Sequence, residues 1–332
     1  MNLLYPLKFK PILKSIIWGG DKICSFKEIT PQQEGIGESW EISHVEGNVS
    51  VVVNGELAGK SLDDLIQQAG VAMIGKTVLE RSGTVFPLLI KFIDARDDLS
   101  IQVHPDDKLA KARHNSFGKT EMWYVINATP DAKLYSGFKQ AITTEEYVTS
   151  VENNTFTDKL QEYNVQSGDV FFLPAGRVHA IGSGCFIAEI QQTSNITYRI
   201  YDYNRKDSQG NGRELHTALA KDAIDYKVYP EGYKTAYEAT KNEVVPLASC
   251  RYFTTNLIEG DSKIERDFHS IDSFVIYICM EGSASITDAF GYKVEVKQGE
   301  SVLVPAACKN RIEIVPFGMC KILETFMQAC NQ

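Results

Sequence analysis

Four polar side chains in this sequence have the types and spacing of a divalent metal site. Gln102 and His104 are two residues apart, so on a β-strand both would point to the same face of the sheet. Glu121 opens a strongly apolar segment, where a carboxylate is costly to bury unless it is paired or bound to a metal. His179 ends the segment 168–179. Together they offer an amide oxygen, two imidazoles and a carboxylate, a plausible donor set for Zn²⁺ or a similar ion.

Each of these side chains has a simpler interpretation when it is taken alone. The glutamine and the first histidine could form a hydrogen-bonded pair at a barrel mouth. The glutamate could lie at a strand end in solvent, and the second histidine could be an ordinary core or surface residue. The combination favours a metal site, although glutamine is an uncommon ligand and makes the set less specific than Cys₂His₂. Of the other histidines, His44 and His216 are interpreted as structural or surface residues.

The elements that must position these residues are predicted to be short β-strands. Apolar segments are separated by glycine, aspartate, asparagine and proline, a pattern typical of strands and turns. Helical patterns are few: Ser61 could cap a helix over 62–68, and Thr143 to Glu146 fits a capping box. Many strands with few helices favour a mainly β jelly-roll fold over a parallel α/β fold. Strands are expected over 86–93, 100–104, 121–126, 170–173, 186–191, 274–279 and 301–304, and further helices over 145–152, 106–113 and 213–222.

A weak internal repeat divides the chain into two related parts. Residues 168–179 and 299–310 both read glycine, acidic residue, apolar strand, Pro-Ala and a polar residue at the same offset. The glycine would form a turn, and the proline would end the strand. The second copy has Asn310 where the first has His179, so only the first part carries the metal set. The predicted units are a jelly-roll β domain over 1–235 that carries the metal set and a degenerate, related β domain over 236–332, with the irregular stretch 227–246 at the passage between them.

Composition and charge restrict the classes of function. The chain has 332 residues, with 34 Lys and Arg against 43 Asp and Glu, a net charge of −9. Neither nucleic acid nor an anionic membrane is an expected partner, because both need a basic surface. No apolar run reaches the ~18 residues of a membrane-spanning helix, and no signal peptide is expected. Seven scattered cysteines without a C-x-x-C pair indicate buried thiols and a cytoplasmic location.

The ordered motifs resemble those of a known family. Segment 168–179 is similar to the second cupin motif, and the first is present in a modified form, Gln102-x-His104 followed after a gap by Glu121. That modification resembles the type I mannose-6-phosphate isomerases, in a compact bacterial form without the helical insertion of the longer members. The resemblance includes stretches 17–20, 37–43, 87–91, 119–121 and 197–203, and it runs from about residue 5 to 230 and more faintly to the end.

The resemblance implies that the chain interconverts mannose 6-phosphate and fructose 6-phosphate through a cis-enediol. Such a reaction needs a base that removes the C2 proton and an acid that returns a proton to C1. One Zn²⁺, or another divalent ion, would polarise the oxygens of the open-chain sugar phosphate. Its implied ligands are Gln102, His104, Glu121 and His179.

The resemblance also suggests residues that act on the sugar. Arg199 is similar to the family's active-site arginine and suits a phosphate or an enediolate, with a surface ion pair to Asp202 as the alternative. Lys91 and Lys119 are candidates for phosphate binding or proton transfer, since burial near a metal would lower the pKa of a lysine towards that of a base. Glu189 is the strongest carboxylate candidate for the base, unless it faces solvent on its strand.

Some neighbouring residues have less definite roles. Trp18 is a candidate substrate contact, and Trp40, like Trp18, could equally pack in the core. Glu41 could orient a metal-bound imidazole. Many relatives have Ser-Asp where this chain has Ser194-Asn195, which weakens any proposal that an aspartate there is the base.

Other functions are compatible with the same fold. A non-catalytic sugar-phosphate-binding cupin would not need the complete metal set, which is intact here. A cupin that uses Fe²⁺ in oxygen chemistry needs an open triad of two histidines and a carboxylate, whereas this chain adds a glutamine and several nearby cations. A metal cupin acting on another sugar phosphate is a further alternative.

Overall fold

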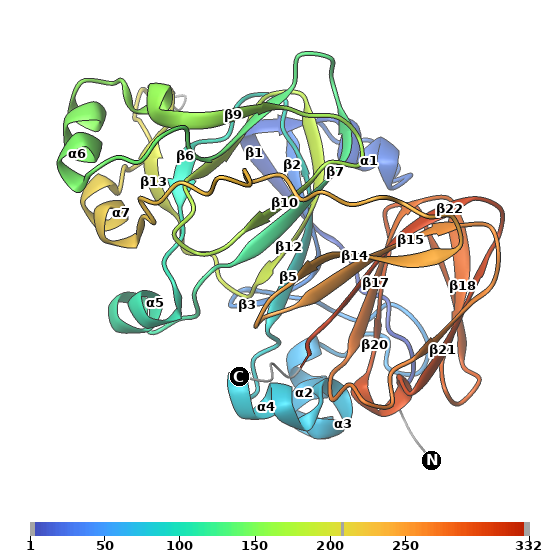
Figure 1. Cartoon of the computed structure of the whole chain (residues 1–332). Coiled ribbons are helices and arrows are strands. Elements are labelled where there is room, and N and C mark those ends of the chain that lie inside the picture. The colour runs from blue at the N-terminus through green and yellow to red at the C-terminus, as the bar shows by residue number, and fades with distance from the viewer. Residues whose placement is uncertain (1–3, 207–208, 329–332) are drawn as a thin grey trace.

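The computed structural model describes residues 4–206 and 209–328, and its strands form two successive two-sheet units (Figure 1). The first unit contains a six-stranded and a five-stranded sheet, with antiparallel pairing between neighbouring strands. The order of the larger sheet is β1 (Ile12–Gly20), β2 (Ile36–Ile42), β5 (Leu88–Asp94), β12 (Cys185–Gln192), β7 (Glu121–Ala128) and β10 (Val170–Leu173). The order of the smaller sheet is β13 (Tyr198–Tyr201), β6 (Ile101–Val103), β11 (His179–Ile181), β8 (Lys133–Phe138) and β9 (Leu160–Asn164). A two-stranded ribbon, β3 (His44–Val45) with β4 (Asn48–Val49), lies outside them.

The C-terminal unit repeats this architecture with fewer strands. Its five-stranded sheet has the order β14 (Glu243–Ser249), β15 (Thr254–Gly260), β22 (Cys320–Phe326), β17 (Val275–Glu281) and β20 (Ser301–Val304). Its four-stranded sheet has the order β16 (Ile264–Asp267), β21 (Arg311–Pro316), β18 (Ser283–Thr287) and β19 (Lys293–Lys297). The prediction of a mainly β fold with few short helices is therefore confirmed.

The helices are short and lie at the edges of the sheets. The predicted cap at Ser61 begins α2, where Asp64 completes a capping box, and the predicted capping box of Thr143 with Glu146 begins α6. The helix predicted over 213–222 begins only at Thr217. The helices are α1 (Lys22–Phe26), α2 (Leu62–Ala69), α3 (Val71–Ile74), α4 (Lys76–Ser82), α5 (Asp107–His114), α6 (Thr144–Glu152) and α7 (Thr217–Ala223), with 3₁₀ turns η1 (Phe156–Lys159) and η2 (Ala306–Cys308).

The predicted sequence repeat corresponds to a structural repeat. In the first unit β10 is an edge strand that pairs with β7, and in the second β20 is an edge strand that pairs with β17. β11 begins at His179, and β21 begins directly after Asn310. The exact domain division at residues 235 and 236 stays a prediction.

The two units are joined by shared packing. Leu7 pairs with Leu303 of β20, so this segment lies against the C-terminal unit, where Figure 1 also shows α2 to α4. Phe86, which precedes β5, packs against Phe274 with ring centroids 4.5 Å apart, and both side chains are fully buried. One continuous hydrophobic core therefore includes residues of both units.

The sequence predicts that the chain has no membrane-spanning helix and that its cysteines are buried thiols. No helix among the described residues is both long and apolar enough to cross a membrane. Cys24, Cys185, Cys279, Cys308 and Cys320 are buried, as predicted. Cys250 is only partly buried, and Cys330 lies outside the described residues.

Replacing Phe86 with alanine tests the shared core. The cavity left beside Phe274 should lower the free energy of unfolding by about 3–5 kcal/mol, measured by urea denaturation. Phe290→Ala is the control, because this side chain is 65% exposed and its loss should change stability by less than about 0.5 kcal/mol. Equal effects of the two substitutions would contradict the assignment of Phe86 to the interface between the units.

Candidate active site

His104, Glu121 and His179 converge inside the first unit from distant parts of the chain. Glu121 begins β7 in the six-stranded sheet, His179 begins β11 in the five-stranded sheet, and His104 follows β6. Their potential ligand atoms all lie within 4.8 Å of one another. The Nε2 atom of His104 is 3.5 Å from Glu121 Oε2, and Nε2 of His179 is 3.3 Å from Oε1. These three residues could therefore hold a metal ion.

Backbone carbonyls fix the orientation of both imidazoles. His104 Nδ1 lies 2.9 Å from the carbonyl oxygen of Ile196, and His179 Nδ1 lies 2.9 Å from that of Arg177. A carbonyl only accepts hydrogen bonds, so each Nδ1 carries a proton and each Nε2 keeps its lone pair. Burial lowers the pKa of both imidazoles, to about 4 for His179, so the rings are neutral at pH 7. Both therefore present a ligand atom towards Glu121.

The environment of Glu121 fits a divalent cation. Its side chain is fully buried, and neither of its oxygens nor Nε2 of His104 has a hydrogen-bond partner among the described residues. Burial, reinforced by the charge of Glu189, raises the pKa of Glu121 to about 8, although Lys119 Nζ is 3.4 Å from Oε2. A cation between these acceptor atoms would stabilise the carboxylate and supply the partner that the atoms lack.

Gln102 is placed beside the same cluster. It lies opposite His179 in the pairing of β6 with β11, and its Nε2 is 3.3 Å from Nε2 of His179. The oxygen and nitrogen of an amide exchange places by rotation of the amide group, so Gln102 can turn its oxygen to this position. The four predicted ligands are thus brought together.

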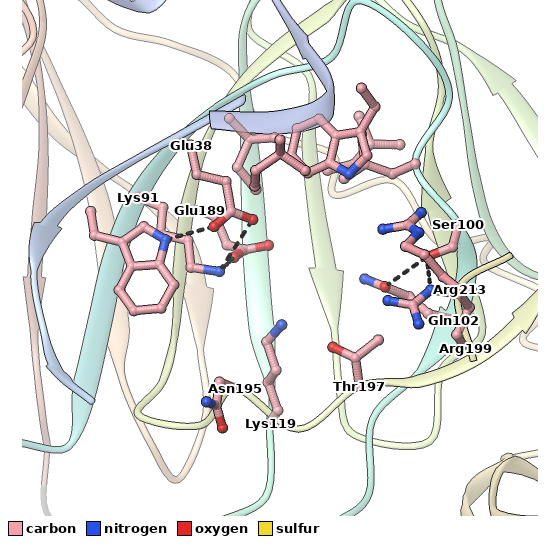
Figure 2. A pocket seen from close by; sticks show the side chains of 16 residues that line it. Glu38, Lys91, Ser100, Gln102, Lys119, Glu189, Asn195, Thr197, Arg199 and Arg213 are labelled. Atoms are coloured by element: carbon pink, nitrogen blue, oxygen red, sulfur yellow. Dashed lines mark hydrogen bonds and ion pairs between the residues drawn. The ribbon is translucent and has the colours of Figure 1, made fainter. Parts of the chain in front are cut away.

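Gln102 and Lys119 line a pocket of about 240 Å³ (Figure 2). Both residues lie beside the cluster, so the pocket adjoins it. All the other residues predicted to act on the sugar line it: Trp18, Lys91, Glu189 and Arg199. The remaining lining residues are Ile16, Glu38, Trp40, Ile93, Leu99, Ser100, Ile181, Asn195, Thr197 and Arg213.

One side of the pocket holds two carboxylates around one lysine (Figure 2). Lys91 Nζ is 3.2 Å from Glu189 Oε1 and 3.8 Å from Glu38 Oε1. Burial alone would lower the pKa of Lys91, but the two carboxylates outweigh it and raise the pKa, so the expectation of a lowered value is wrong. Lys91 therefore stays an ammonium group.

Glu189 is buried rather than solvent-facing, so that alternative is wrong. Its side chain accepts a hydrogen bond from Trp123 Nε1 at 2.8 Å, and it is only 3% exposed. Burial raises the pKa of Glu189, but Lys91 and Lys119 more than compensate and the net shift is downwards. Glu189 is therefore ionised at the pocket wall.

The opposite side of the pocket holds two arginines (Figure 2). Arg199 donates from Nη1 to the carbonyl oxygen of Glu214 at 2.9 Å. Arg213 donates from Nε to Asp202 Oδ2 at 2.7 Å. Among the described side chains Asp202 pairs with Arg213 and Arg205, so the alternative of an ion pair between Arg199 and Asp202 is wrong.

Sequence reasoning missed several lining residues, among them Glu38 and Arg213, although it did name Trp40. Alternation along β2 points Glu38 and Trp40 into the pocket. Glu41 instead pairs with Lys27 at 2.8 Å, so the proposed contact with a metal-bound imidazole is wrong. Applying the two-residue period to this strand would have identified Glu38. No sequence pattern placed Arg213 at the pocket, because the sequence predicts a helix over 213–222 whereas α7 begins only at Thr217.

Comparisons with known proteins agree on one family. The family described as phosphomannose isomerase type I, catalytic domain, matches residues 7–154. Mannose-6-phosphate isomerase ManA of Bacillus subtilis is 35% identical over 304 residues, which cover 90% of this chain and 93% of that protein. Mannose-6-phosphate isomerase of Streptococcus mutans is 33% identical over 308 residues, covering 92% and 94%.

Solved structures give the same result. The crystal structure of mannose 6-phosphate isomerase from Bacillus subtilis superposes with a TM-score of 0.84 at 30% identity, covering 96% of this chain and 99% of that one. A mutant of phosphomannose isomerase from Salmonella typhimurium superposes with a TM-score of 0.78 at 15% identity, covering 97% and 99%, and supports the fold alone.

Metal binding tests the cluster directly. After chelation the protein should take up about one Zn²⁺ per chain, measured by competition with a chelating dye and by elemental analysis. His179→Ala should abolish this uptake. His44→Ala should retain it, because His44 is not part of the cluster and its Nε2 lies 3.1 Å from Asp63 Oδ1. Retention of the ion by His179→Ala would contradict the site.

The pH dependence of Zn²⁺ binding tests the protonation states. Between about pH 5.5 and 7 the imidazoles are already neutral and Glu121, with its pKa of about 8, holds the proton that must leave. The dissociation constant should therefore fall about tenfold for each unit of rising pH. A slope near a hundredfold per unit would show that an imidazole is also protonated.

Proposed function

The chain belongs to the type I phosphomannose isomerase family, and we propose on that basis that it interconverts D-mannose 6-phosphate and D-fructose 6-phosphate through a cis-enediol. The observation that carries the proposal is the position of the metal-competent cluster at a pocket with a carboxylate–lysine side and a two-arginine side. An aldose–ketose isomerase needs both a proton-transferring side and an anion-binding side. A pocket that only bound a sugar phosphate would not need the buried cluster.

Zn²⁺ is the proposed ion, held by Gln102, His104, Glu121 and His179. Two neutral imidazoles, a carboxylate and an amide oxygen suit Zn²⁺, although other divalent ions accept the same donors. When bound, the ion would polarise the carbonyl and hydroxyl oxygens of the open-chain sugar. The protein contributes the orientation of the ligands through the carbonyl groups that hold each Nδ1.

The two-arginine side is the proposed phosphate site. The guanidinium groups of Arg199 and Arg213 both line it, and a planar fork suits phosphate oxygens. Lys91 is a poorer candidate, because Glu38 and Glu189 lie beside it and would repel a phosphate dianion. The phosphate would therefore fix the sugar with its C1–C2 end towards the carboxylates.

Glu189 is the proposed base that removes the C2 proton. Apart from the ion pair with Lys91, its Oε1 is buried without a hydrogen-bond partner among the described residues, and Glu189 lines the pocket. The ammonium of Lys91 holds it as a carboxylate and could donate to a sugar hydroxyl. Lys119, between the pocket and Glu121, is the proposed partner in proton transfer, and Trp18 forms part of the wall that contacts the sugar.

We also propose that residues 1–235 form the catalytic domain and 236–332 a supporting cupin-like domain. All the residues assigned above to the ion and the sugar precede residue 235. A cytoplasmic location is proposed too, because buried thiols such as Cys24 and Cys279 suit a reducing compartment.

The function is tested with a coupled assay for fructose 6-phosphate formation from mannose 6-phosphate. Chelated protein should lose its activity and regain it when Zn²⁺ is added back, since the ion stabilises the charge that develops on the sugar oxygens. Glucose 6-phosphate and unphosphorylated mannose serve as controls and should react far more slowly. Full activity of the metal-free protein would contradict the role of the ion, and turnover of glucose 6-phosphate alone would contradict the substrate.

Two substitutions separate the proposed sides of the pocket. Arg213→Gln should raise KM for mannose 6-phosphate about tenfold with little change in kcat, because a phosphate contact is lost. Glu189→Gln should lower kcat at least about a hundredfold with the metal retained, because the base is lost. Arg205→Gln is the control: Arg205 also pairs with Asp202 but does not line the pocket. If Arg205→Gln raised KM as much, Arg213 would not be a specific phosphate contact.

A further inference from the structure

A chain of hydrogen bonds connects the C-terminal unit to the segment that carries Lys119. Tyr252 lies in the turn between β14 and β15, a hairpin that reaches from the C-terminal unit towards the first (Figure 1). Its hydroxyl donates to Asp107 Oδ2 at 2.7 Å. Asp107 is the first residue of α5, shortly after His104. The C-terminal unit therefore touches the chain close to a predicted metal ligand.

The second oxygen of Asp107 holds two further groups. Oδ1 accepts hydrogen bonds from the backbone N–H of Gly118 and from Gln192 Nε2, both at 3.0 Å. A Cβ atom on Gly118 would lie 2.6 Å from the backbone nitrogen of Asp107, so this close approach requires glycine. Asp107 thus joins α5 to the end of β12 and to the segment before β7.

Gln192 completes the link on the other side of Lys119. Its side-chain Oε1 accepts a hydrogen bond from the backbone N–H of Thr120 at 2.8 Å, and its backbone N–H donates to the Thr120 carbonyl oxygen at 3.1 Å. The residues before and after Lys119 are therefore both held, directly or through Gln192, by Asp107. Lys119 Nζ lies 3.4 Å from Glu121 Oε2 and lines the pocket.

We propose that Tyr252 is a positioning residue for the isomerisation, acting through Asp107 on the placement of Lys119. With only Oδ1 engaged, the Asp107 carboxylate could rotate away from its two donors. The third hydrogen bond, from Tyr252 to Oδ2, fixes the plane of the carboxylate and so the backbone on both sides of Lys119. This inference rests on the proposed function, and it gives the C-terminal unit a part in catalysis although it contributes no lining residue to the pocket.

The test is the kinetics of Tyr252→Phe with mannose 6-phosphate at saturating Zn²⁺. Loss of the hydroxyl should lower kcat about tenfold, because small misplacement of a group that acts in the reaction slows it, while KM changes less than about twofold. Tyr237→Phe is the matched control. Tyr237 lies on the segment that connects the units, far along the chain from Lys119, and its hydroxyl donates to the Gly168 carbonyl at 2.6 Å. This control should keep the wild-type kcat.

A double substitution separates positioning from general structural damage. In a Lys119→Met background, Tyr252→Phe should cause no further fall in kcat, because the residue through which it acts is already gone. A further fall by the same factor would overturn the inference, as would an unchanged kcat of Tyr252→Phe alone or an equal loss in Tyr237→Phe. A wild-type protein inactive on mannose 6-phosphate would instead overturn the proposed function, and the inference with it.

Discussion

The burial of the Glu121 carboxylate is the constraint on which the rest of the site depends. An ionised carboxylate without water is stable only beside positive charge or strong hydrogen-bond donors. Its nearest neighbours in the cluster are two imidazoles that are neutral and present lone pairs, and the Lys119 ammonium 3.4 Å away leaves the pKa of Glu121 raised. The protein thus gathers buried acceptor atoms that lack hydrogen-bond partners among the described residues, an arrangement that suits a divalent cation.

Charge is distributed unevenly around the pocket that adjoins the cluster. Lys91 is neutralised by Glu38 and Glu189, which leaves that side acidic and suited to proton transfer. Asp202 offsets part of the charge of Arg213 while Arg199 contacts a carbonyl group, so the other side stays cationic. A chain with a net charge of −9 can therefore still present a local site for a phosphate.

Sequence patterns predicted the fold and the cluster because both follow from short-range rules. The two-residue spacing of Gln102 and His104, and the glycine and proline of the repeat, are local signals that survive without tertiary information. The raised pKa of Lys91 and the place of Arg213 are not local. They depend on which strands become neighbours, such as β5 between β2 and β12, and on an irregular segment folding back over the pocket. The role proposed for Glu41 is wrong for a reason that is local. Alternation along β2 places Glu41 on the opposite face from Glu38 and Trp40.

The internal repeat shows why only one unit carries the cluster. The strand registers pair Glu189 with Trp123 and Lys91, and they pair Glu324 with Tyr277 and Asn256 in the same arrangement. The C-terminal unit therefore keeps a counterpart of the proposed base.

Neighbouring side chains occupy both carboxylate oxygens of this counterpart, Glu324. Arg266 binds Glu324 through two hydrogen bonds of 2.8 and 2.9 Å, and the hydroxyl of Tyr277 adds a third at 3.1 Å. At the position equivalent to Glu121 the register places Val275, so the residue that creates the demand for a cation is missing. Both units therefore stabilise one buried carboxylate with an internal cation, Lys91 beside Glu189 and Arg266 beside Glu324. Only the first unit adds a second buried carboxylate, Glu121, whose oxygens are left without a hydrogen-bond partner among the described residues.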